Sequence, residues 1–488
     1  MKDIMTGNEA AAWGARLAEV DYVPIYPITP QTEIVEKIAS WAASGQMKAR
    51  VTPMESEHSM LTAAGLASLS GARVFTATSS QGLVYAFEML YKVAGWRSPM
   101  VMVNVSRALS SPGTLLPDHN DVLSARDTGF MQFHAETVQD ALDSILMAYR
   151  VSEDRRVMLP SIVNLDGFYL SYTREPLELP AQEDVRAFLP PYPIPPLSVP
   201  KLPSFGILTS GSSPYLYFKY QVHLAQREAL RVLDEAASDF HRLFGRKHEL
   251  AEGFMLEDAE YAIVCTDSFT TIMRRLVREA RHQGIRLGLL KLWVMRPFPA
   301  ERVADMLSGK TAVAVFDQDI SPGLGGAIYQ EVAGALYGID SPPKLLGFVD
   351  GLGGKVPSEG EMDVILKALI NGWTGQHLLM SASDLHEVNK ERMILQRGQT
   401  GGDRIGAQDK DHQGHPFRRA PLSRFFSLCW LRGSAHAETH AQGHGSERLH
   451  RQLVWMHDIS PDLSVFQLGW RVGIRLPGVG SGRSSGNR

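Results

Sequence analysis

The sequence predicts an α/β protein built on parallel sheets with helices on both faces. Short apolar runs, such as MVMVNV over residues 100–105, alternate with longer segments of helical periodicity through the first 170 residues. The same alternation begins again near residue 255, after a proline-rich stretch. Strands that alternate with helices are typical of parallel sheets, because the chain must cross back over the sheet between successive strands.

The first series of elements begins with a helix expected over 6–20, for which Asn8 is a plausible N-cap. Apolar runs then predict strands, and segments rich in alanine and leucine predict helices. Gly71 is placed to end the helix expected over 59–69. The other expected strands lie at 22–26, 74–77, 100–105 and 157–164, and the other expected helices lie at 33–41, 82–91 and 138–149.

The proline-rich stretch spans residues 176–203 and contains nine prolines. Proline removes a backbone donor and fixes φ, so we expect an extended surface connector there, without a helix or a central strand. A long amphipathic helix is expected next, over 218–244. Together these segments predict a first domain over 1–254.

A second, smaller doubly wound domain is predicted over 255–375, because the same alternation recurs there. The glycine-rich turn Gly323–Gly326 lacks the spacing of a nucleotide-binding loop, and we interpret it as a packing or partner contact. The expected elements are strands at 261–265, 287–292 and 311–316, helices at 270–283 and 300–307, and a turn followed by a helix over 323–336.

The composition changes after residue 390. Residues 391–488 contain one lysine, Lys410, against thirteen arginines, and their hydrophobic periodicity is weak. We interpret this part as an irregular, mostly disordered tail, with a shifted reading frame as an alternative origin. His436, His440 and His444 are spaced four apart, but glycine interrupts the spacing and no carboxylates join them. We therefore predict no metal site.

The overall composition excludes several classes of protein. A net charge of −4 gives no basic surface for nucleic acid. No apolar run approaches the ~20 residues that span a bilayer, and the first ten residues lack a signal-peptide core, so we expect a cytoplasmic chain. Cys265 and Cys429 are too few to hold an iron–sulfur cluster. We expect Cys265 to be a small buried strand residue.

Glu57 is the first candidate for chemistry, because it opens a helix with apolar neighbours such as Met60 and Leu61. A carboxyl group there is poorly hydrated, which favours holding or sharing a proton near neutral pH. Capping of the helix is the simpler interpretation of the same residue. Glu55, two residues earlier, competes for either role.

Thr29 and Arg107 are candidates for binding a substrate. Thr29 stands between Pro27 and Pro30, which hold its hydroxyl in a fixed direction, although a plain strand-exit turn gives the same pattern. Arg107 follows the apolar run 100–105, and ligands bind at the carboxyl ends of parallel strands. An arginine there can grip a carboxylate with two hydrogen bonds or form a structural ion pair.

A polar turn, Ser79-Ser80-Gln81-Gly82, separates an expected strand from an expected helix. Its backbone N–H groups can bind an anion or a polar ring, and Gly82 allows a ligand to approach the backbone closely. The turn is a weak signal by itself. Its position beside the segments of Glu57 and Arg107 makes it more informative.

In this order and spacing, several motifs together resemble one family. The segments YPITPQTEIVEKIA, ESEH, GARVFTATSSQGL, EMLYKVAG and VMVNVSRAL are similar to alpha subunits of the pyruvate:ferredoxin oxidoreductase (pyruvate synthase) family. The resemblance continues through DAEYAIVCTDSF and VAVFDQDISPGLGG and covers about residues 5–375. It implies a thiamine-diphosphate-binding sheet domain of the pyrimidine-binding type, followed by a domain like the C-terminal domain of transketolase.

The resemblance also implies roles for the candidate residues. Glu57 corresponds to the glutamate that contacts the thiamine pyrimidine, and Ser80, Gln81 and Gly82 would line that cofactor site. Thr29 and Arg107 correspond to the residues that contact the 2-oxoacid and neutralise its carboxylate. The family decarboxylates the 2-oxoacid oxidatively, passes electrons through iron–sulfur clusters to ferredoxin and transfers the acyl group to coenzyme A.

The same resemblance implies partner subunits. A beta subunit would share thiamine diphosphate and magnesium with this chain, because the sequence lacks the Gly-Asp-Gly motif that holds the diphosphate. Gamma-type and delta-type subunits would complete the complex, with the iron–sulfur clusters on partner subunits only. The chain alone is expected to be inactive.

Substrate identity stays open at the level of sequence. The loop after Arg107 lacks the Gly-Pro-Ser-Thr-Gly stretch of 2-oxoglutarate relatives, which favours pyruvate. A larger 2-oxoacid, such as 2-oxoisovalerate or an aryl-glyoxylate, is the alternative. A second alternative is a non-catalytic scaffold subunit of such a complex.

Overall fold

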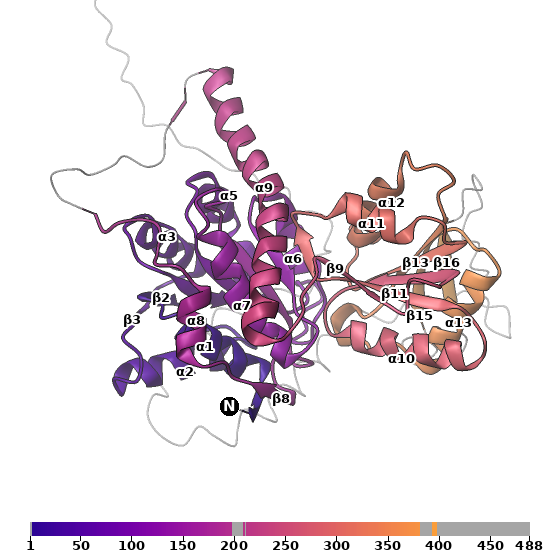
Figure 1. Ribbon diagram of the computed structural model, residues 1–488, viewed down its shortest axis with the longest axis horizontal. Helices are drawn as coiled ribbons and strands as arrows, with labels where there is room; N and C mark the ends of the chain where they lie inside the picture. The colour runs from indigo at the N-terminus through magenta and orange to yellow at the C-terminus, as the bar shows by residue number, and fades with distance from the viewer. Residues whose placement is uncertain (1, 198–207, 210, 381–392, 398–488) are drawn as a thin grey trace, which may run out of the picture. The chain divides into compact units, whose positions relative to one another are not determined.

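A computed structural model describes residues 2–197, 208–209, 211–380 and 393–397 of the chain. These residues belong to one compact unit, Met1–Gly401. Figure 1 labels its helices and strands. The histidines at 436, 440 and 444, Cys429 and most of the expected tail lie outside the described residues.

The first sheet contains five strands in the order β12–β6–β7–β5–β4, and every neighbouring pair is parallel except β12 with β6. A parallel pair, β2 and β3, lies beyond β4 and is linked to it by a bridge between Tyr22 and Val74. The predicted α/β class is therefore confirmed. The strands are β2 (Tyr22–Ile25), β3 (Arg50–Pro53), β4 (Phe75–Thr78), β5 (Val101–Ser106), β6 (Met131–His134), β7 (Ser161–Asp166) and β12 (Val294–Arg296).

Helices cover both faces of this sheet. Val101 and Val103 of β5 pack into one core cluster with α1 (Gly7–Leu17) and α7 (Val138–Ser152). Met102, between them, packs into a second cluster with α3 (Glu57–Leu69) and α5 (Phe87–Gly95). The strand is apolar at almost every position because neither of its faces meets water.

Two details of the helices differ from the predictions. Helix α1 is capped by Thr6, which forms a capping box with Glu9, whereas the expected cap, Asn8, is buried inside the first turn. The single helix expected over 82–91 is two helices that meet at Ala86. The remaining helices of this part are α2 (Thr32–Ala43), α4 (Ser80–Tyr85), α6 (Asn120–Ser124) and the 3-10 turn η1 (Ala125–Asp127).

The proline-rich stretch is more regular than expected. It contains the helix α8 (Gln182–Phe188), so the prediction of no helix there is wrong, because seven residues between prolines suffice for two turns. The strand β8 (Arg174–Glu178) pairs antiparallel with β1 (Lys2–Thr6) as a two-stranded sheet. Pro176 is tolerated because β8 has one neighbour only.

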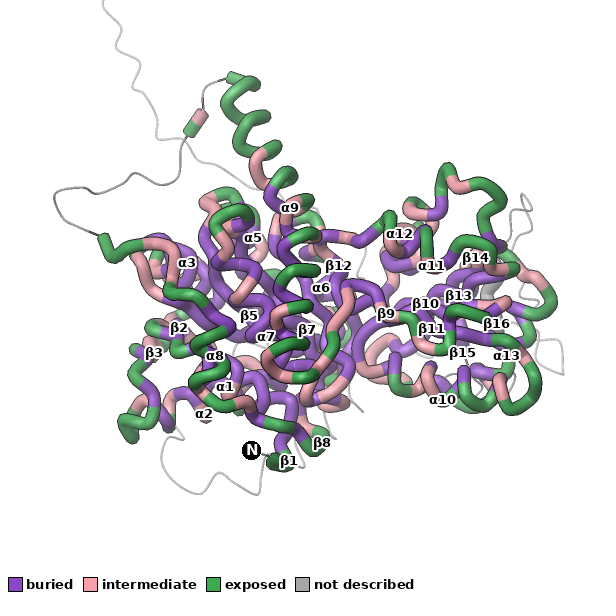
Figure 2. The backbone as a smooth tube through the Cα atoms, in the orientation of Figure 1, coloured by how far each residue is buried: buried purple, intermediate pink, exposed green. Residues whose placement is uncertain are grey.

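The long helix expected next is α9 (Ser212–Phe244). Its second half is buried against the first sheet domain, and its first turns are exposed, as the green colour in Figure 2 shows. No helix among the described residues is long and apolar enough to cross a membrane.

The second sheet contains seven strands in the order β16–β15–β14–β13–β10–β11–β9, parallel in its centre and antiparallel at both edges. Helices α11 (Ala300–Leu307) and α12 (Ala327–Leu336) cover one face, and α10 (Phe269–His282) and α13 (Glu359–Ile370) cover the other (Figure 1). The strands are β9 (Ala251–Phe254), β10 (Tyr261–Cys265), β11 (Leu287–Leu292), β13 (Ala312–Asp317), β14 (Lys344–Val349), β15 (Gly375–Met380) and β16 (Met393–Arg397).

Two predictions concern residues of this second sheet, Cys265 and the segment that contains β16. Cys265 ends β10 and is fully buried, as predicted. The strand β16 lies inside the segment 391–488 that was expected to be irregular, so that expectation is wrong for residues 393–397. The short turn η2 (Leu352–Gly354) follows β14.

The chain crosses directly from the second sheet to the first sheet. The strand β11 belongs to the second sheet, but the chain continues through Trp293 into β12, which pairs with β6 of the first sheet. Trp293 is buried, and its indole N–H donates to Ser144 Oγ on α7 at 2.9 Å. The strand β9, before the expected boundary at residue 254, already pairs with β11. The division into domains at 254/255 stays a prediction.

A buried ion cluster also joins the two parts. Lys291 of β11 donates to Asp140 of α7 at 2.6 Å, and its ammonium group lies 3.1 Å from Glu136. Both carboxylates are buried. Burial opposes the charge on Lys291, but Asp140 and Glu136 outweigh that effect and raise its pKa. The lysine therefore stays charged and compensates two buried anions.

We expect Lys291→Met to lower the free energy of unfolding by about 3 kcal/mol, because it removes the buried ammonium group that donates to Asp140 and leaves the cluster with His248 beside Asp140 and Arg274 beside Glu136 as its remaining cations. Urea denaturation followed by tryptophan fluorescence measures the change. Lys37→Met is the matched control, because Lys37 is 41% exposed and 3.7 Å from its partner Glu9. Equal stability of both variants would contradict the role assigned to Lys291.

Candidate active site

The candidate site lies at the carboxyl edge of the first sheet. It is built by the loops that follow β2, β4 and β5 and by the first turn of α3. All of the predicted site residues belong to these segments. Parallel strands point their carboxyl ends to one edge of a sheet, which is why segments far apart in the sequence meet here.

Glu57 is the first residue of α3 and is only 6% exposed. The helix is capped by Ser56, whose hydroxyl accepts a hydrogen bond from the Ser59 N–H at 3.2 Å. The cap is therefore supplied by serine, and Glu57 is not needed for it. Glu55 is exposed and accepts a hydrogen bond from the Ser59 hydroxyl. The structure thus separates the two glutamates that the sequence left in competition.

Gly82 forms a small cradle beside Glu57. A Cβ atom at Gly82 would lie 2.6 Å from Glu57 Oε1 and 2.6 Å from Thr78 Oγ1, so no larger residue fits without displacing them. The Thr78 hydroxyl is buried and has no hydrogen-bond partner. Within the described part of the chain, no donor is hydrogen-bonded to the Glu57 carboxylate either. The cradle brings two polar groups together against the backbone of Gly82.

Thr29 and Arg107, the two residues predicted to bind the substrate, lie in contact with each other. The Arg107 guanidinium donates to the Thr29 carbonyl oxygen at 2.8 Å. The contact uses the backbone of Thr29 and not the hydroxyl that the prolines were expected to direct. The buried side chain of Asn8 donates to the Pro30 carbonyl at 3.0 Å and thereby holds the Thr29 loop on α1.

Gln81 orients Arg107 from the other side. Its side-chain oxygen accepts from the guanidinium at 2.8 Å, and its amide donates to Ser110 Oγ at 3.0 Å. Partial burial lowers the pKa of Arg107, against the opposing effect of Asp121. Gln81 was predicted to bind a cofactor, and the contact that the structure places on it is with the candidate substrate arginine.

Ser80 is buried at the start of α4, with a left-handed φ of 48°. Its hydroxyl donates to the Ala108 carbonyl at 3.0 Å and to Gln81 Oε1 at 2.6 Å. These bonds tie the turn after β4 to the loop after β5. Ser80 therefore stabilises the shape of the site, and its predicted contact with a cofactor stays a prediction.

Asp121 connects these loops through hydrogen bonds to its carboxylate. One of its carboxylate oxygens accepts from the backbone N–H groups of Ser80 at 3.0 Å and Arg107 at 3.2 Å. The same oxygen accepts from the Asn104 side chain at 3.1 Å. Burial raises the pKa of Asp121, and these donors act in the opposite direction. The carboxylate is the common acceptor for the turn after β4 and for the end of β5.

Asn164 extends the polar network toward the second sheet. Its side-chain oxygen accepts from Asn104 at 2.9 Å and from Ser106 at 2.8 Å. Its amide donates to Asp267 at 3.3 Å, and Asp267 lies 2.5 Å from the His134 ring. Because Asp267 follows β10, the network crosses from the first sheet to the second.

His119 lies at the end of this network. Its Nε2 is 2.7 Å from Asp166 and 3.3 Å from Asp267, and all three side chains are buried. Burial would lower the pKa of His119, but Asp267 and Asp166 raise it to about 10. The ligand atoms of His119, Asp166 and Asp267 lie within 4.8 Å of one another, so the three residues form a buried ion-pair network.

Sequence reasoning missed this network. Asp166 ends β7 and Asp267 follows β10, so both occupy the positions where open sheets gather functional side chains. A search for polar residues at the carboxyl ends of every predicted strand would have found them. Asp121 and His119 carry no such signal, because the loop that holds them contains no predicted element.

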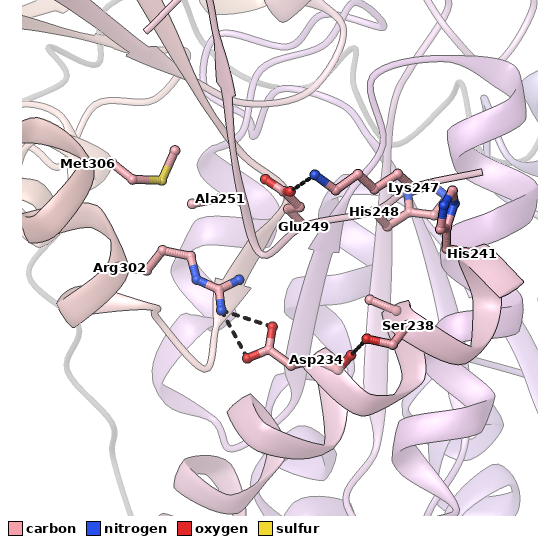
Figure 3. Close-up of a pocket in the computed structure, with 10 residues that line it drawn as sticks. Asp234, Ser238, His241, Lys247, His248, Glu249, Ala251, Arg302 and Met306 are labelled. Carbon is pink, nitrogen blue, oxygen red and sulfur yellow. Dashed lines mark hydrogen bonds and ion pairs between the residues drawn. The ribbon is translucent and has the colours of Figure 1, made fainter. Parts of the chain in front are cut away.

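A separate cavity of about 410 Å³ lies between the C-terminal half of α9 and α11 (Figure 3). None of the predicted site residues lines it. Its charged groups are already paired, since Arg302 donates to both oxygens of Asp234 at 2.9 Å and Lys247 pairs with Glu249. These pairs give the cavity little net charge to offer a ligand.

Comparisons with known proteins show the class of protein to which this chain belongs. The family model described as pyruvate flavodoxin/ferredoxin oxidoreductase, thiamine diphosphate-binding, matches residues 13–237. The model for pyruvate:ferredoxin oxidoreductase core domain II matches residues 259–362. The fold and these two matches define a chain of the thiamine-diphosphate-binding class.

Individual relatives narrow the class to a family. Pyruvate synthase subunit PorA of Methanothermobacter thermautotrophicus is 42% identical over 369 residues, which are 75% of this chain and 95% of that protein. PorA of Thermotoga maritima is 38% identical over 372 residues, which are 75% of this chain and 94% of that protein. Ketoisovalerate oxidoreductase subunit VorA of Pyrococcus horikoshii is 40% identical and 90% covered. The chain belongs to the pyruvate:ferredoxin oxidoreductase family, among its alpha subunits.

A solved structure supports the fold. The 2-oxoglutarate:ferredoxin oxidoreductase from Magnetococcus marinus matches with a TM-score of 0.57 and 20% identity. The match covers 76% of this chain and 65% of that one. At this identity the likeness concerns the fold alone.

We expect Asp121→Ala to lower the free energy of unfolding by about 3 kcal/mol or more, because the N–H groups of Ser80 and Arg107 lose a buried acceptor. Chemical denaturation of the isolated chain measures this. Asp127→Ala is the control, because the Asp127 side chain is 69% exposed and forms a surface ion pair with Arg296 at 3.5 Å. A difference below about 0.5 kcal/mol between the two variants would remove Asp121 from the centre of the site.

Proposed function

We propose that this chain is the alpha subunit of a multi-subunit enzyme that decarboxylates pyruvate oxidatively. Coenzyme A takes the acetyl group and ferredoxin takes the electrons, and the same complex can run the synthesis in reverse. One observation carries the proposal: a buried glutamate and a half-buried arginine share one sheet edge in a chain that is 42% identical to a pyruvate synthase subunit.

Thiamine diphosphate supplies the electron sink that decarboxylation of a 2-oxoacid requires. The residues at the Gly82 cradle fit its pyrimidine ring. The cradle brings a residue without a side chain, a carboxylate and an unpartnered hydroxyl to one place. A pyrimidine ring has nitrogen atoms and an amino group at its edge, which can form hydrogen bonds with a carboxylate and a hydroxyl. Glu57 and Gly82 are the residues that would hold it.

Glu57 would share a proton with a ring nitrogen. The Glu57 residue is only 6% exposed, and no protein donor within the described residues competes for its carboxylate. A carboxylate without protein partners is a strong acceptor, because a hydrogen bond to a charged group gains strength where water is excluded. The residue is thus suited to hold a proton at a defined position during turnover.

Arg107 would bind the carboxylate of the 2-oxoacid. A guanidinium has five N–H donors, and Thr29 and Gln81 engage it from opposite sides. Its Nε–H is buried and has no partner. The bonds to Thr29 and Gln81 fix the plane of the guanidinium, so its remaining donors can meet a carboxylate without paying for side-chain ordering again.

Partner subunits would complete the site. The chain lacks a diphosphate-binding motif and has two cysteines in all, so a beta subunit would hold the diphosphate with magnesium and other subunits would hold the clusters. Val84 and Tyr85, directly after the Gly82 turn, are 43% and 62% exposed, and Leu66 on α3 is 43% exposed. Apolar side chains exposed beside a half-site suit a subunit contact. We place the complex in the cytoplasm.

A larger 2-oxoacid is the second candidate substrate. The similarity to VorA, at 40% identity, is nearly as high as that to PorA. A panel of pyruvate, 2-oxoisovalerate and 2-oxoglutarate, assayed on the reconstituted complex with coenzyme A and ferredoxin, distinguishes the candidates. A complex that reduces ferredoxin with none of them would leave the scaffold role instead.

We expect Glu57→Gln to lower the turnover of the reconstituted complex at least about a hundredfold, because the amide cannot share the proton. Glu55→Gln is the matched control, two residues away and exposed, and should keep normal turnover. Ferredoxin reduction at saturating pyruvate is the measurement. Near-normal turnover of Glu57→Gln would reject the proposed role and favour a scaffold subunit.

Arg107→Met should raise the KM for the 2-oxoacid roughly 10- to 100-fold, the cost of removing charge-assisted hydrogen bonds to its carboxylate. Steady-state kinetics with varied pyruvate measures this change. The exposed Arg156, which forms a surface ion pair with Glu235, provides the control variant Arg156→Met. An unchanged KM in Arg107→Met would show that another group binds the carboxylate.

A further inference from the structure

Thr78 is a residue of the site that no part of the sequence reasoning singled out. It is the last residue of β4, and its hydroxyl is fully buried without a hydrogen-bond partner. The hydroxyl of Thr76, two residues earlier on the same strand, donates to the Pro24 carbonyl at 2.8 Å, whereas Asn104 Oδ1, opposite Thr78 on β5, is also buried without a partner. A buried hydroxyl without a partner costs free energy, so its presence at Thr78 needs an explanation.

The position of the hydroxyl supplies one. Thr78 Oγ1 and Glu57 Oε1 are each 2.6 Å from the point where a side chain would begin at Gly82. The two oxygens therefore face the same small space. Threonine has a stiff χ1, so its hydroxyl holds its place, whereas the glutamate side chain can rotate toward it.

We propose that Thr78 is the positioning residue for Glu57. Its hydroxyl donates to Oε1 of Glu57 in the cofactor-loaded complex, and this leaves the second carboxylate oxygen, Oε2, for the ring nitrogen of the cofactor. The inference rests on the proposed function. It adds a donor that fixes which oxygen of Glu57 faces the ligand.

Energetics favour this assignment over a structural role. A structural hydroxyl would have a partner in the unloaded chain, as that of Thr76 does. The carboxylate of Glu57 also lacks a donor in the described residues, so one hydrogen bond satisfies both groups. Gly82 permits this geometry because it leaves the space between the two oxygens open.

The test compares Thr78→Val, which keeps the shape of the side chain and removes the hydroxyl, with Thr78→Ser, which keeps the hydroxyl. In the reconstituted complex, Thr78→Val should lower kcat at least about tenfold, the loss expected for one hydrogen bond to a charged group, with little change in the KM for pyruvate. Thr78→Ser should restore kcat to within about threefold of the natural chain.

Melting of the unloaded chain separates positioning from folding. Thr78→Val should melt at the same temperature as the natural chain or higher, because it removes a hydroxyl that has no partner there. A clear fall in melting temperature would assign the hydroxyl a structural role and overturn the proposal. Natural kcat in Thr78→Val, or a serine variant that is no better than valine, would overturn it too.

Calorimetric titration of thiamine diphosphate into the natural complex distinguishes failure of this inference from failure of the proposed function. If the natural complex binds the cofactor and Thr78→Val keeps its kcat, the role of Thr78 is wrong and the function stands. If the natural complex binds no thiamine diphosphate, both are wrong.

Discussion

The buried carboxylate of Asp121 is the interaction on which the candidate site depends. Ser80 and Arg107 belong to loops that follow different strands, and both donate their backbone N–H groups to the same carboxylate oxygen. A charged acceptor shared by two loops fixes their separation more firmly than apolar packing does, because hydrogen bonds are directional. This group holds the turn of Gly82 beside the backbone of Arg107, and the bonds of Ser80 to Ala108 and of Gln81 to the Arg107 guanidinium reinforce that arrangement.

Asp121 is itself held by a polar interior that reaches the second sheet. Asn104 and Asn164 link it to Asp267, and His119 carries the positive charge that compensates Asp166 and Asp267. Such a network is costly to bury, and in this one Asn104 Oδ1 and His119 Nδ1 are buried without a partner. Its cost is consistent with a site whose precision matters more than the stability of the fold.

The sequence predicted the sheet architecture better than the site. Apolar runs such as 100–105 identify strands because both faces of a parallel sheet are buried, and this signal is local. The resemblance implied that Arg107 and Thr29 both contact the substrate, which stays a prediction, and it did not imply the hydrogen bond between them. The prediction of no helix in residues 176–203 was wrong because prolines interrupt a helix only where they stand, and α8 lies between two of them.

Other features had no local signal at all. His119 precedes the short helix α6 and Asp121 lies in its first turn, and their importance arises from partners that are distant in the sequence, such as Ser80 and Asp267. The strand β12 has three residues and pairs with β6, about 160 positions earlier, so no periodicity could reveal it. Burial of Glu57 could be expected from its neighbours, whereas the unpartnered state of Thr78 needed coordinates.

The crossing between the two sheets at Trp293 has a consequence for how the molecule can be divided. A polypeptide ending at residue 254 would carry the whole Glu57 cradle but would lack β12, which covers the outer edge of β6. The backbone donors and acceptors of that edge would then be open to any other extended chain, and unprotected edges invite association. The cradle is thus a poor candidate for use as an independent module, even though every residue that lines it comes from the first 110 positions.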